Sequence, residues 1–319
     1  MVIGIDLGAT KIAGGLFDID GNLTITESIL LNNATGNEVG ILITGLIDKL
    51  LKSGSEQGLT VKGIGVCVPG ISNQHLGTVW APNIPGWESY RLHEEISQMM
   101  EDNSVAVVID SDRSCSLLGE VWKGCAQGSS NAIFLAIGSG IGAGILANGT
   151  IVTGAGGIAG AVGWLGLNQP YFTKYDSCGN FEYYASGIGL VRYTRELMAD
   201  DTAQESILWQ KSLENITAED VFEAYDQGDS IAGQVIENAI VYWGIAVANL
   251  TSIFNPEIII FGGGVFGPAT KFLNEIKEEA KKWAQPISIG EVDLQKSSLG
   301  GNAGMIGAGY LAIKELSGN

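Results

Sequence analysis

The chain has 319 residues, of which 45% are hydrophobic and 16% charged, and its formal net charge is −18. This composition indicates a globular protein of about two domains and excludes a disordered chain. Because carboxylates are repelled by phosphates, the charge argues against nucleic acid or an anionic membrane as a partner. Any nucleotide is therefore expected to bind through backbone N–H groups and Mg²⁺.

The N-terminus shows no leader-like segment, and no apolar stretch of about 18 residues predicts a membrane span. The four cysteines form no C-x-x-C pair, and two histidines are too few for a multi-histidine metal site. These features favour a reducing, cytoplasmic location. The cysteines are Cys67, Cys115, Cys125 and Cys178.

The first half of the chain alternates short apolar runs with segments of helical spacing, which favours an α/β fold. The turn Asp20-Gly21-Asn22 has the composition of a hairpin turn. Strands are predicted over residues 2–6, 12–17, 23–31, 61–68 and 105–109, and helices over 38–53, 90–101 and 113–123.

The second half opens with the same outline of strand, glycine-rich turn, strand and Asn-Gly turn. This repetition favours two related lobes over a chance likeness between two hairpins. Strands are predicted over residues 132–137, near Ile145 and over 257–261. From residue 187 the chain is predicted to be mostly helical. Helices are predicted over 231–254, from Pro268 to about Trp283, and over 302–316.

Two glycine-rich turns follow apolar strands. Asp6-Leu-Gly-Ala-Thr-Lys11 offers the flexible Gly8, the hydroxyl of Thr10 and loop N–H groups that can face a phosphate. Asp6 can hold Mg²⁺ directly or through water. An ordinary β-turn is the alternative. The second turn, Gly138 to Gly144, adds the hydroxyl of Ser139, and the two turns together could clamp a triphosphate.

A third glycine cluster, Gly262-Gly263-Gly264, completes G-x-G-x-x-G with Gly267 between a predicted strand and helix. Only about 50 residues follow, too few for the rest of a dinucleotide-binding fold. We interpret the glycines as a surface for adenine or ribose. A dinucleotide enzyme is the less favoured alternative.

The segment Asp110-Ser111-Asp112 ends one predicted strand and precedes a helix. A carboxylate there can accept the proton of a hydroxyl that attacks phosphorus. The other interpretation is that Asp112 caps the helix, since aspartate is a favoured N-cap, and the two roles are compatible. The residues alone favour neither interpretation.

Taken together, these motifs resemble the ROK family of sugar kinases, relatives of actin and hexokinase. The resemblance covers nearly the whole chain. It rests on DLGATK at 6–11, VPG at 68–70, APNIPGW at 81–87, DSDRSCSLLGE at 110–120, GSGIGAGI at 138–145, CGNFEYYASG at 178–187 and NPEIIIFGGGV at 255–265.

The resemblance implies a two-lobed, actin-like (ribonuclease H-like) ATPase fold of class α/β, with each lobe a mixed sheet flanked by helices. It implies a small lobe of residues 1–112 plus about 300–319 and a large lobe of 113–299. Asp112 would be the catalytic base. The ATP and Mg²⁺ site would comprise Asp6, Gly8, Thr10, Lys11, Gly138, Ser139, Gly140, Gly262, Gly263 and Gly264, and the sugar would contact Gly70, Asn83, Ser111, Asp112 and Glu182.

The chain departs from the family pattern in the sugar pocket. Where the family has a glutamate and a histidine in AGExGH, this chain has Ala161 and Trp164. That histidine is also a family zinc ligand, and of the cysteine-rich segment only Cys178-Gly179 remains. One cysteine cannot hold tetrahedral zinc, so no zinc is expected. Trp164 could stack on a sugar face or pack in the core.

We therefore expect an ATP- and Mg²⁺-dependent kinase for a sugar, amino sugar, cyclitol or glycoside, which by the resemblance forms a homodimer. A sugar-binding sensor without catalysis is the alternative, because the sugar and zinc motifs are altered. The family's repressors carry a DNA-binding segment before the first lobe. This chain starts at the first strand, so that function is not expected.

Overall fold

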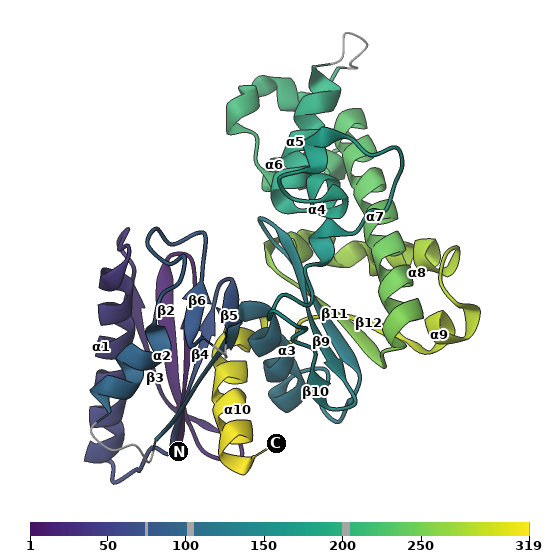
Figure 1. The fold of residues 1–319 in the computed structure, drawn as a ribbon. Helices are drawn as coiled ribbons and strands as arrows, with labels where there is room; N and C mark the ends of the chain where they lie inside the picture. Colours follow the sequence, from purple (N-terminus) through teal and green to yellow (C-terminus); the bar gives the residue numbers. More distant parts are fainter. Residues whose placement is uncertain (74–75, 101–104, 200–204, 319) are drawn as a thin grey trace. The chain divides into compact units, whose positions relative to one another are not determined.

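The N-terminal apolar runs form a mixed sheet. In the computed structural model, which describes residues 1–73, 76–100, 105–199 and 205–318, five strands lie in the order β3-β2-β1-β4-β7 (Figure 1). β1 pairs antiparallel with β2 and parallel with β4. The strands are β1 (Val2–Leu7), β2 (Lys11–Phe17), β3 (Leu23–Leu30), β4 (Gly63–Val68) and β7 (Ala106–Ser111).

Helices cover both faces of this sheet. Buried residues of α1 (Asn37–Glu56) and α2 (Leu92–Met99) share a core with Ile3 and Ile5 of β1. Val2, whose side chain faces the opposite side of the strand, packs with α10 (Ala303–Ser317) instead. α3 (Asp112–Lys123) packs beside α10, and a short hairpin comprises β5 (Ile71–Asn73) and β6 (Thr78–Trp80). Residue 101, part of the predicted helix 90–101, lies outside the described residues.

Helix α10 approaches its neighbours at backbone distance. A Cβ atom added at Gly65 of β4 would lie 1.8 Å from the carbonyl oxygen of Ala308. One added at Gly307 would lie 1.7 Å from the carbonyl oxygen of Cys115 in α3. Only glycine fits at either position. The helix that carries Asp112 is therefore fixed closely against the sheet through α10.

The second sheet repeats the first. Its strand order is β10-β9-β8-β11-β12, with β8 antiparallel to β9 and parallel to β11. Each strand thus has a counterpart in the N-terminal sheet, as the repeated sequence outline indicated. The strands are β8 (Ala132–Ile137), β9 (Ile141–Ala147), β10 (Thr150–Ile151), β11 (Ile258–Gly262) and β12 (Asp293–Lys296).

Six α-helices accompany this sheet among the described residues, with α7 packed against α4, α5, α6 and α8. α7 is long and apolar enough to span a membrane, contrary to the sequence-based expectation, but 61% of its most apolar window is buried inside the structure. That burial suits the core helix of a globular unit. The helices are α4 (Asn180–Ala185), α5 (Gly187–Met198), α6 (Ala218–Asp226), α7 (Ser230–Phe254), α8 (Leu273–Lys281) and α9 (Pro286–Glu291).

Several short 3₁₀ turns complete this part of the chain. The helix predicted from Pro268 to about Trp283 is divided into η6 (Pro268–Phe272) and α8. Two further turns lie before α4, namely η1 (Val162–Trp164) and η2 (Thr173–Tyr175). The first contains Trp164, one of the departures from the family pattern, and the second precedes Cys178.

The contacts divide the chain into two units. Unit 1 comprises Met1–Ser129, Ile151–Ala159 and Ser297–Asn319, and unit 2 comprises Ser130–Thr150 and Gly160–Lys296. The sequence-based division placed α3 with the second lobe, whereas here it lies in unit 1 because it packs against α10.

Candidate active site

A cavity of about 940 Å³ in unit 1 collects residues from the N-terminal hairpin, the start of α3 and the start of α10. Of the residues predicted to bind phosphate, Mg²⁺ or sugar, it brings together Asp6, Gly8, Thr10, Asn83 and Asp112. The glycines at 300, 301 and 304, which motif analysis did not identify, complete one wall.

Asp112 is the first residue of α3, and it does not cap that helix. The N-cap is Ser111, whose hydroxyl oxygen accepts a 3.3 Å hydrogen bond from the backbone N–H of Ser114. The interpretation of Asp112 as the capping residue is therefore wrong. Its carboxylate instead lines the cavity, where 53% of the side chain is exposed.

Arg113 is a charged neighbour that motif analysis missed. Its Nε lies 3.9 Å from Oδ1 of Asp112, and its guanidinium donates a 3.4 Å hydrogen bond to the carbonyl oxygen of Gly70. Desolvation by burial raises the pKa of Asp112, the Arg113 charge opposes that rise, and the Asp6 carboxylate adds to it. Because 53% of the Asp112 side chain is exposed, solvent limits this rise, but its direction favours acceptance of a proton.

Asp6 lies at the end of β1 against α10. A Cβ atom at Gly304 would be 2.9 Å from the carboxyl atoms of Asp6, so glycine leaves room for this group. Desolvation raises the pKa of Asp6, while a hydrogen bond with Cys67 and the charge of Lys11 lower it. A desolvated carboxylate on a cavity wall is a suitable oxygen ligand for Mg²⁺.

Gly70 and Ser111 lie apart from the residues of this cavity wall. The Gly70 carbonyl oxygen accepts from Arg113, and at a φ of 121° the residue adopts backbone geometry that favours glycine. Ser111 is 6% exposed and lines a neighbouring cavity of about 160 Å³ with Asp110 and Ser114. Lys11 is exposed at the start of β2.

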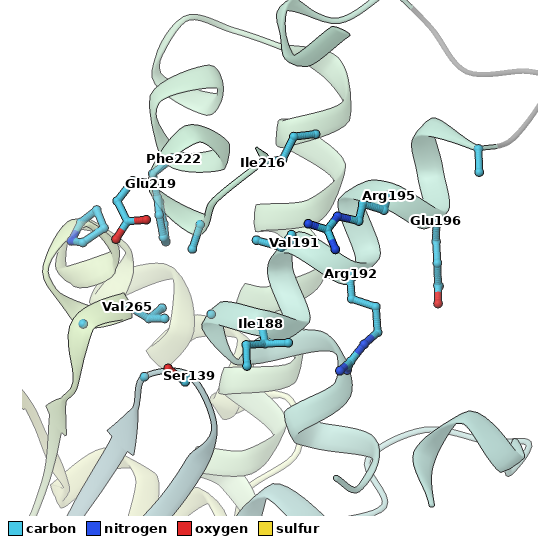
Figure 2. Close-up of a pocket in the computed structure, with 16 residues that line it drawn as sticks. Ser139, Ile188, Val191, Arg192, Arg195, Glu196, Ile216, Glu219, Phe222 and Val265 are labelled. Atoms are coloured by element: carbon cyan, nitrogen blue, oxygen red, sulfur yellow. The ribbon is translucent and has the colours of Figure 1, made fainter. Parts of the chain in front are cut away.

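The second glycine-rich turn lies at the edge of a cavity of about 1000 Å³ within unit 2. The carbonyl oxygen of Gly138 accepts a 2.7 Å hydrogen bond from the N–H of Gly187, which ties the turn to the start of α5. Figure 2 shows Ser139, Ile188, Val191, Phe222 and Val265 around this space. The apolar wall and the turn's hydroxyl and N–H groups suit a nucleoside with phosphates.

The third glycine cluster contributes one residue to this cavity. Gly264 lines it, whereas a Cβ atom at Gly263 would lie 2.3 Å from the carbonyl oxygen of Ile137. At Gly262 a Cβ atom would lie 2.2 Å from the ring of Phe134. These two glycines allow β11 and its following turn to approach β8 closely.

Helix α5 supplies cavity residues that no motif identified. Ile188, Val191, Arg192, Arg195 and Glu196 all come from it. The guanidinium of Arg195 donates to the carbonyl oxygens of Leu213 at 2.7 Å and Glu214 at 3.1 Å. The helical repeat of apolar residues and arginines from residue 187 was the available signal.

Glu182, predicted to contact the sugar, binds the glycine-rich turn. Its Oε2 accepts a 2.6 Å hydrogen bond from the N–H of Ile141, and Cβ atoms at Gly140 or Gly163 would collide with the Glu182 side chain. Desolvation raises the pKa of Glu182, against the lowering effects of the Ile141 N–H and of Arg192. The neighbouring Trp164 is 58% exposed, so its interpretation as a core residue is wrong.

The residues at the expected zinc position do not fit a zinc ion. The thiol of Cys178 contacts the guanidinium of Arg192 at 3.7 Å and the carbonyl oxygen of Gly179 at 3.8 Å. Asn180 and Trp164 supply no thiolate or imidazole, the ligands that structural zinc sites use. No cluster of three or more His, Cys, Asp or Glu suited to a metal occurs among the described residues.

Two mixed sheets of equal topology, with glycine-rich hairpin turns, define the actin-like ATPase architecture. The chain belongs to the ROK family, whose model matches residues 2–315.

Named relatives include kinases and repressors. The chain is 32% identical to a glucokinase of Halalkalibacterium halodurans, over 98% of this chain and 95% of the relative. It is 29% identical to a xylose repressor of Caldicellulosiruptor bescii, over 99% of this chain and 78% of the relative. A solved ROK family glucokinase from Streptomyces griseus, in complex with glucose and AMPPNP, matches with a TM-score of 0.71 and 28% identity, covering 98% of this chain and 99% of that chain.

Proposed function

We propose that this protein is an ATP-dependent carbohydrate kinase in which Asp112 is the general base. The observation that carries the proposal is the state of the Asp112 carboxylate. It lies at the wall of the unit 1 cavity, partial desolvation raises its pKa, and Ser111 fulfils the capping role in its place. Such a carboxylate can accept the proton of a hydroxyl during attack on a phosphoryl group.

The nucleotide is assigned to the cavity of unit 2. Ile188, Val191 and Phe222 provide an apolar wall for adenosine, and Gly264 and Val265 lie beside them. Ser139 and Gly140 are proposed to face the phosphates through backbone N–H groups and one hydroxyl, beside Gly138, whose own N–H bonds the Gly140 carbonyl oxygen at 3.0 Å. These neutral donors suit a protein with few basic side chains.

In unit 1, Gly8, Thr10 and Lys11 are proposed to contact the phosphates, and Asp6 to hold Mg²⁺ directly or through water. Bound Mg²⁺ would neutralise charge that develops on the phosphate oxygens. The partly desolvated Asp6 carboxylate, beside the small Gly304, fits this assignment.

The acceptor is proposed to be a sugar, amino sugar, cyclitol or glycoside that contacts Asn83, Asp112, Glu182 and Trp164. Ser111 and Gly70 are proposed to support these contacts, Ser111 as the cap of α3 and Gly70 through Arg113. Ala161 and Trp164 stand where the family pattern has glutamate and histidine. The loss of these two hydrogen-bonding side chains disfavours binding of an ordinary hexose. The exposed Trp164 ring instead offers a face for stacking on a sugar ring or an aglycone.

A coupled ADP-release assay with Mg²⁺-ATP, run over sugars, amino sugars, cyclitols and glycosides, tests this proposal. We expect turnover with at least one acceptor, saturable in that acceptor and lost without Mg²⁺. The Asp112→Asn protein is the matched control for contaminating kinases. Turnover that persists in this control would contradict the assignment of the base.

A sugar-responsive sensor without catalysis is the second candidate, and similarity to a xylose repressor over 99% of this chain favours considering it. Calorimetric titration separates the two. Saturable sugar binding together with no ADP release across the panel would support the sensor. We further propose a cytoplasmic homodimer, which light scattering of the purified protein would test.

A further inference from the structure

The segment that leads into α4 is fastened by aromatic rings around one lysine. Nζ of Lys174, in η2, lies 4.8 Å from the ring centroid of Tyr183 and 5.1 Å from that of Tyr184. It also forms an ion pair with Glu196 of α5 at 3.1 Å. Each of the two charged side chains is 35% exposed, so the pair lies at the edge of the unit.

Tyr183 joins the same carboxylate from α4. Its hydroxyl donates a 2.5 Å hydrogen bond to Oε1 of Glu196, and burial followed by this bond raises its pKa to about 12. Burial acts to lower the pKa of Lys174, but hydrogen bonding to Tyr184 and Glu196 outweighs it and raises that pKa. Both groups therefore keep their protons at neutral pH, and the cluster retains its charge pattern.

Two further contacts hold the same segment. The side-chain carbonyl oxygen of Asn180 accepts hydrogen bonds from the N–H groups of Leu167 at 2.9 Å and Asn168 at 3.1 Å. Arg192 lies 4.3 Å from the Tyr183 ring centroid and donates to the Tyr183 carbonyl oxygen at 3.3 Å. The chain around α4 is thus connected to η2, to α5 and to the loop after η1 without a metal ligand.

We infer that Lys174 is a positioning residue for Glu182, and that its cluster with Tyr183 and Glu196 replaces a metal ion as the fastening of α4. Tyr183 follows Glu182 directly in α4, so a displacement of the helix backbone at Tyr183 would also displace the carboxylate that bonds the Ile141 N–H at 2.6 Å. An effect of Lys174 on acceptor binding rests on the proposed function of Glu182. The inference that the cluster holds α4 in place does not rest on it.

The test compares Lys174→Met with Lys271→Met. Lys271 has the same chemistry elsewhere in unit 2, because it pairs with Asp226 and lies over the rings of Tyr225 and Phe272. Hydrogen–deuterium exchange is measured for the peptide that contains Ile141. We expect at least a tenfold faster exchange in Lys174→Met, wild-type exchange in Lys271→Met, and rescue by Lys174→Arg, which keeps the charge over the rings.

Acceptor binding gives the second readout. Calorimetry should show weaker acceptor binding in Lys174→Met, restored in Lys174→Arg and unaffected in Lys271→Met, a pattern that a general loss of stability would not produce. If the wild type binds no acceptor, the proposed function fails while the exchange result still decides the fastening. Wild-type exchange in Lys174→Met would overturn the inference. So would stoichiometric zinc in the purified protein whose removal by a chelator lowers the midpoint of thermal unfolding.

Discussion

The hydroxyl oxygen of Ser111 accepts the backbone N–H of Ser114 at 3.3 Å and so caps α3 one residue before the carboxylate of Asp112. The Asp112 carboxylate accepts the adjacent N–H of Arg113 at 2.9 Å, and the cap itself does not depend on it. Ser111 therefore stabilises the helix, while the adjacent Asp112 is available for catalysis. A substitution of Asp112 should change activity without removing the cap.

Asp112→Asn should lower turnover by at least about 100-fold, the usual contribution of a general base. The folded state should survive, since Ser111 still caps α3. Nucleotide affinity should stay near the wild-type value, because the wall proposed to bind adenosine lies in unit 2. Steady-state kinetics and calorimetry with AMPPNP check both halves. Turnover within a few-fold of wild type would remove Asp112 from the mechanism.

Arg113→Met should shift the pH dependence of kcat/KM. A general base must be ionised, so activity falls as pH falls through the pKa of Asp112. The positive charge of Arg113 lowers that pKa, against burial and the Asp6 carboxylate, which raise it. Removing the charge should move the acidic limb to higher pH. An unchanged limb, measured with the same acceptor and saturating Mg²⁺, would show that another group titrates.

Glu120→Gln should destabilise unit 1 by on the order of 2 kcal/mol or more, since it leaves a buried donor without an acceptor. The Glu120 side chain is fully buried, and its two oxygens accept the N–H groups of Leu299 at 3.1 Å and Cys125 at 2.9 Å. These backbone donors cannot reverse, so either orientation of a glutamine amide places an N–H group against another. Denaturant unfolding measures the loss, with the exposed Glu315→Gln as the control.

The same carboxylate gives a pH signature. Although burial raises the pKa of Glu120, hydrogen bonds from the Ser297 hydroxyl and the Leu299 and Cys125 N–H groups outweigh it and lower that pKa. A group with a depressed folded-state pKa contributes stability above its unfolded pKa and loses it as pH falls through the folded pKa. The difference in unfolding free energy between wild type and Glu120→Gln should therefore shrink in acid.

Gly307→Ala and Gly45→Ala should have opposite effects. The first places a methyl group 1.7 Å from the carbonyl oxygen of Cys115, forcing α10 away from α3 at a cost of about 1–3 kcal/mol. Gly45 lies within α1 with no atom near its added Cβ. Alanine there should stabilise the helix by about 0.5–1 kcal/mol. The denaturant midpoints of the two variants test whether close packing decides if alanine stabilises or destabilises the protein.

The double substitution Ala161→Glu with Trp164→His should redirect acceptor choice toward ordinary hexoses. Trp164 is 58% exposed, so its replacement removes little packing. Two regained hydrogen-bonding groups should raise kcat/KM for a hexose by about tenfold or more. The ratio of kcat/KM values between a hexose and the preferred acceptor of the wild type is the measurement. An unchanged ratio would show that neither position recognises the acceptor.

The fold was largely predictable because its signals are local. The hairpins, the buried strands and the apolar spacing of α1 and α7 depend on neighbouring residues, and their positions agree with expectation within a few residues. The helix predicted from Pro268 to about Trp283 is divided after Phe272, and the sequence did not show this because both parts have helical composition.

The candidate site was harder to predict because its partners come from distant segments. Motifs identified Asp6, Asp112 and Ser139 as candidate site residues. The role of Arg113 is visible only in the structure, where it lies beside Asp112 and donates to the Gly70 carbonyl oxygen. Glycine composition also cannot distinguish a ligand surface from close packing. Gly262 and Gly263, predicted to face adenosine, also allow β11 and its turn to lie close to β8, and the composition alone did not indicate this second role.

Helix α10 completes a sheet whose strands all precede residue 112 in the chain. During synthesis, the strands of unit 1 emerge first, but the helix that fits against Gly65 follows the whole of unit 2. One apolar face of the early sheet therefore stays uncovered while the roughly 190 residues between β7 and α10 are translated. The nascent chain is accordingly expected to depend on chaperones at this stage, and the late arrival of α10 makes its docking the final step in forming the Asp112 site.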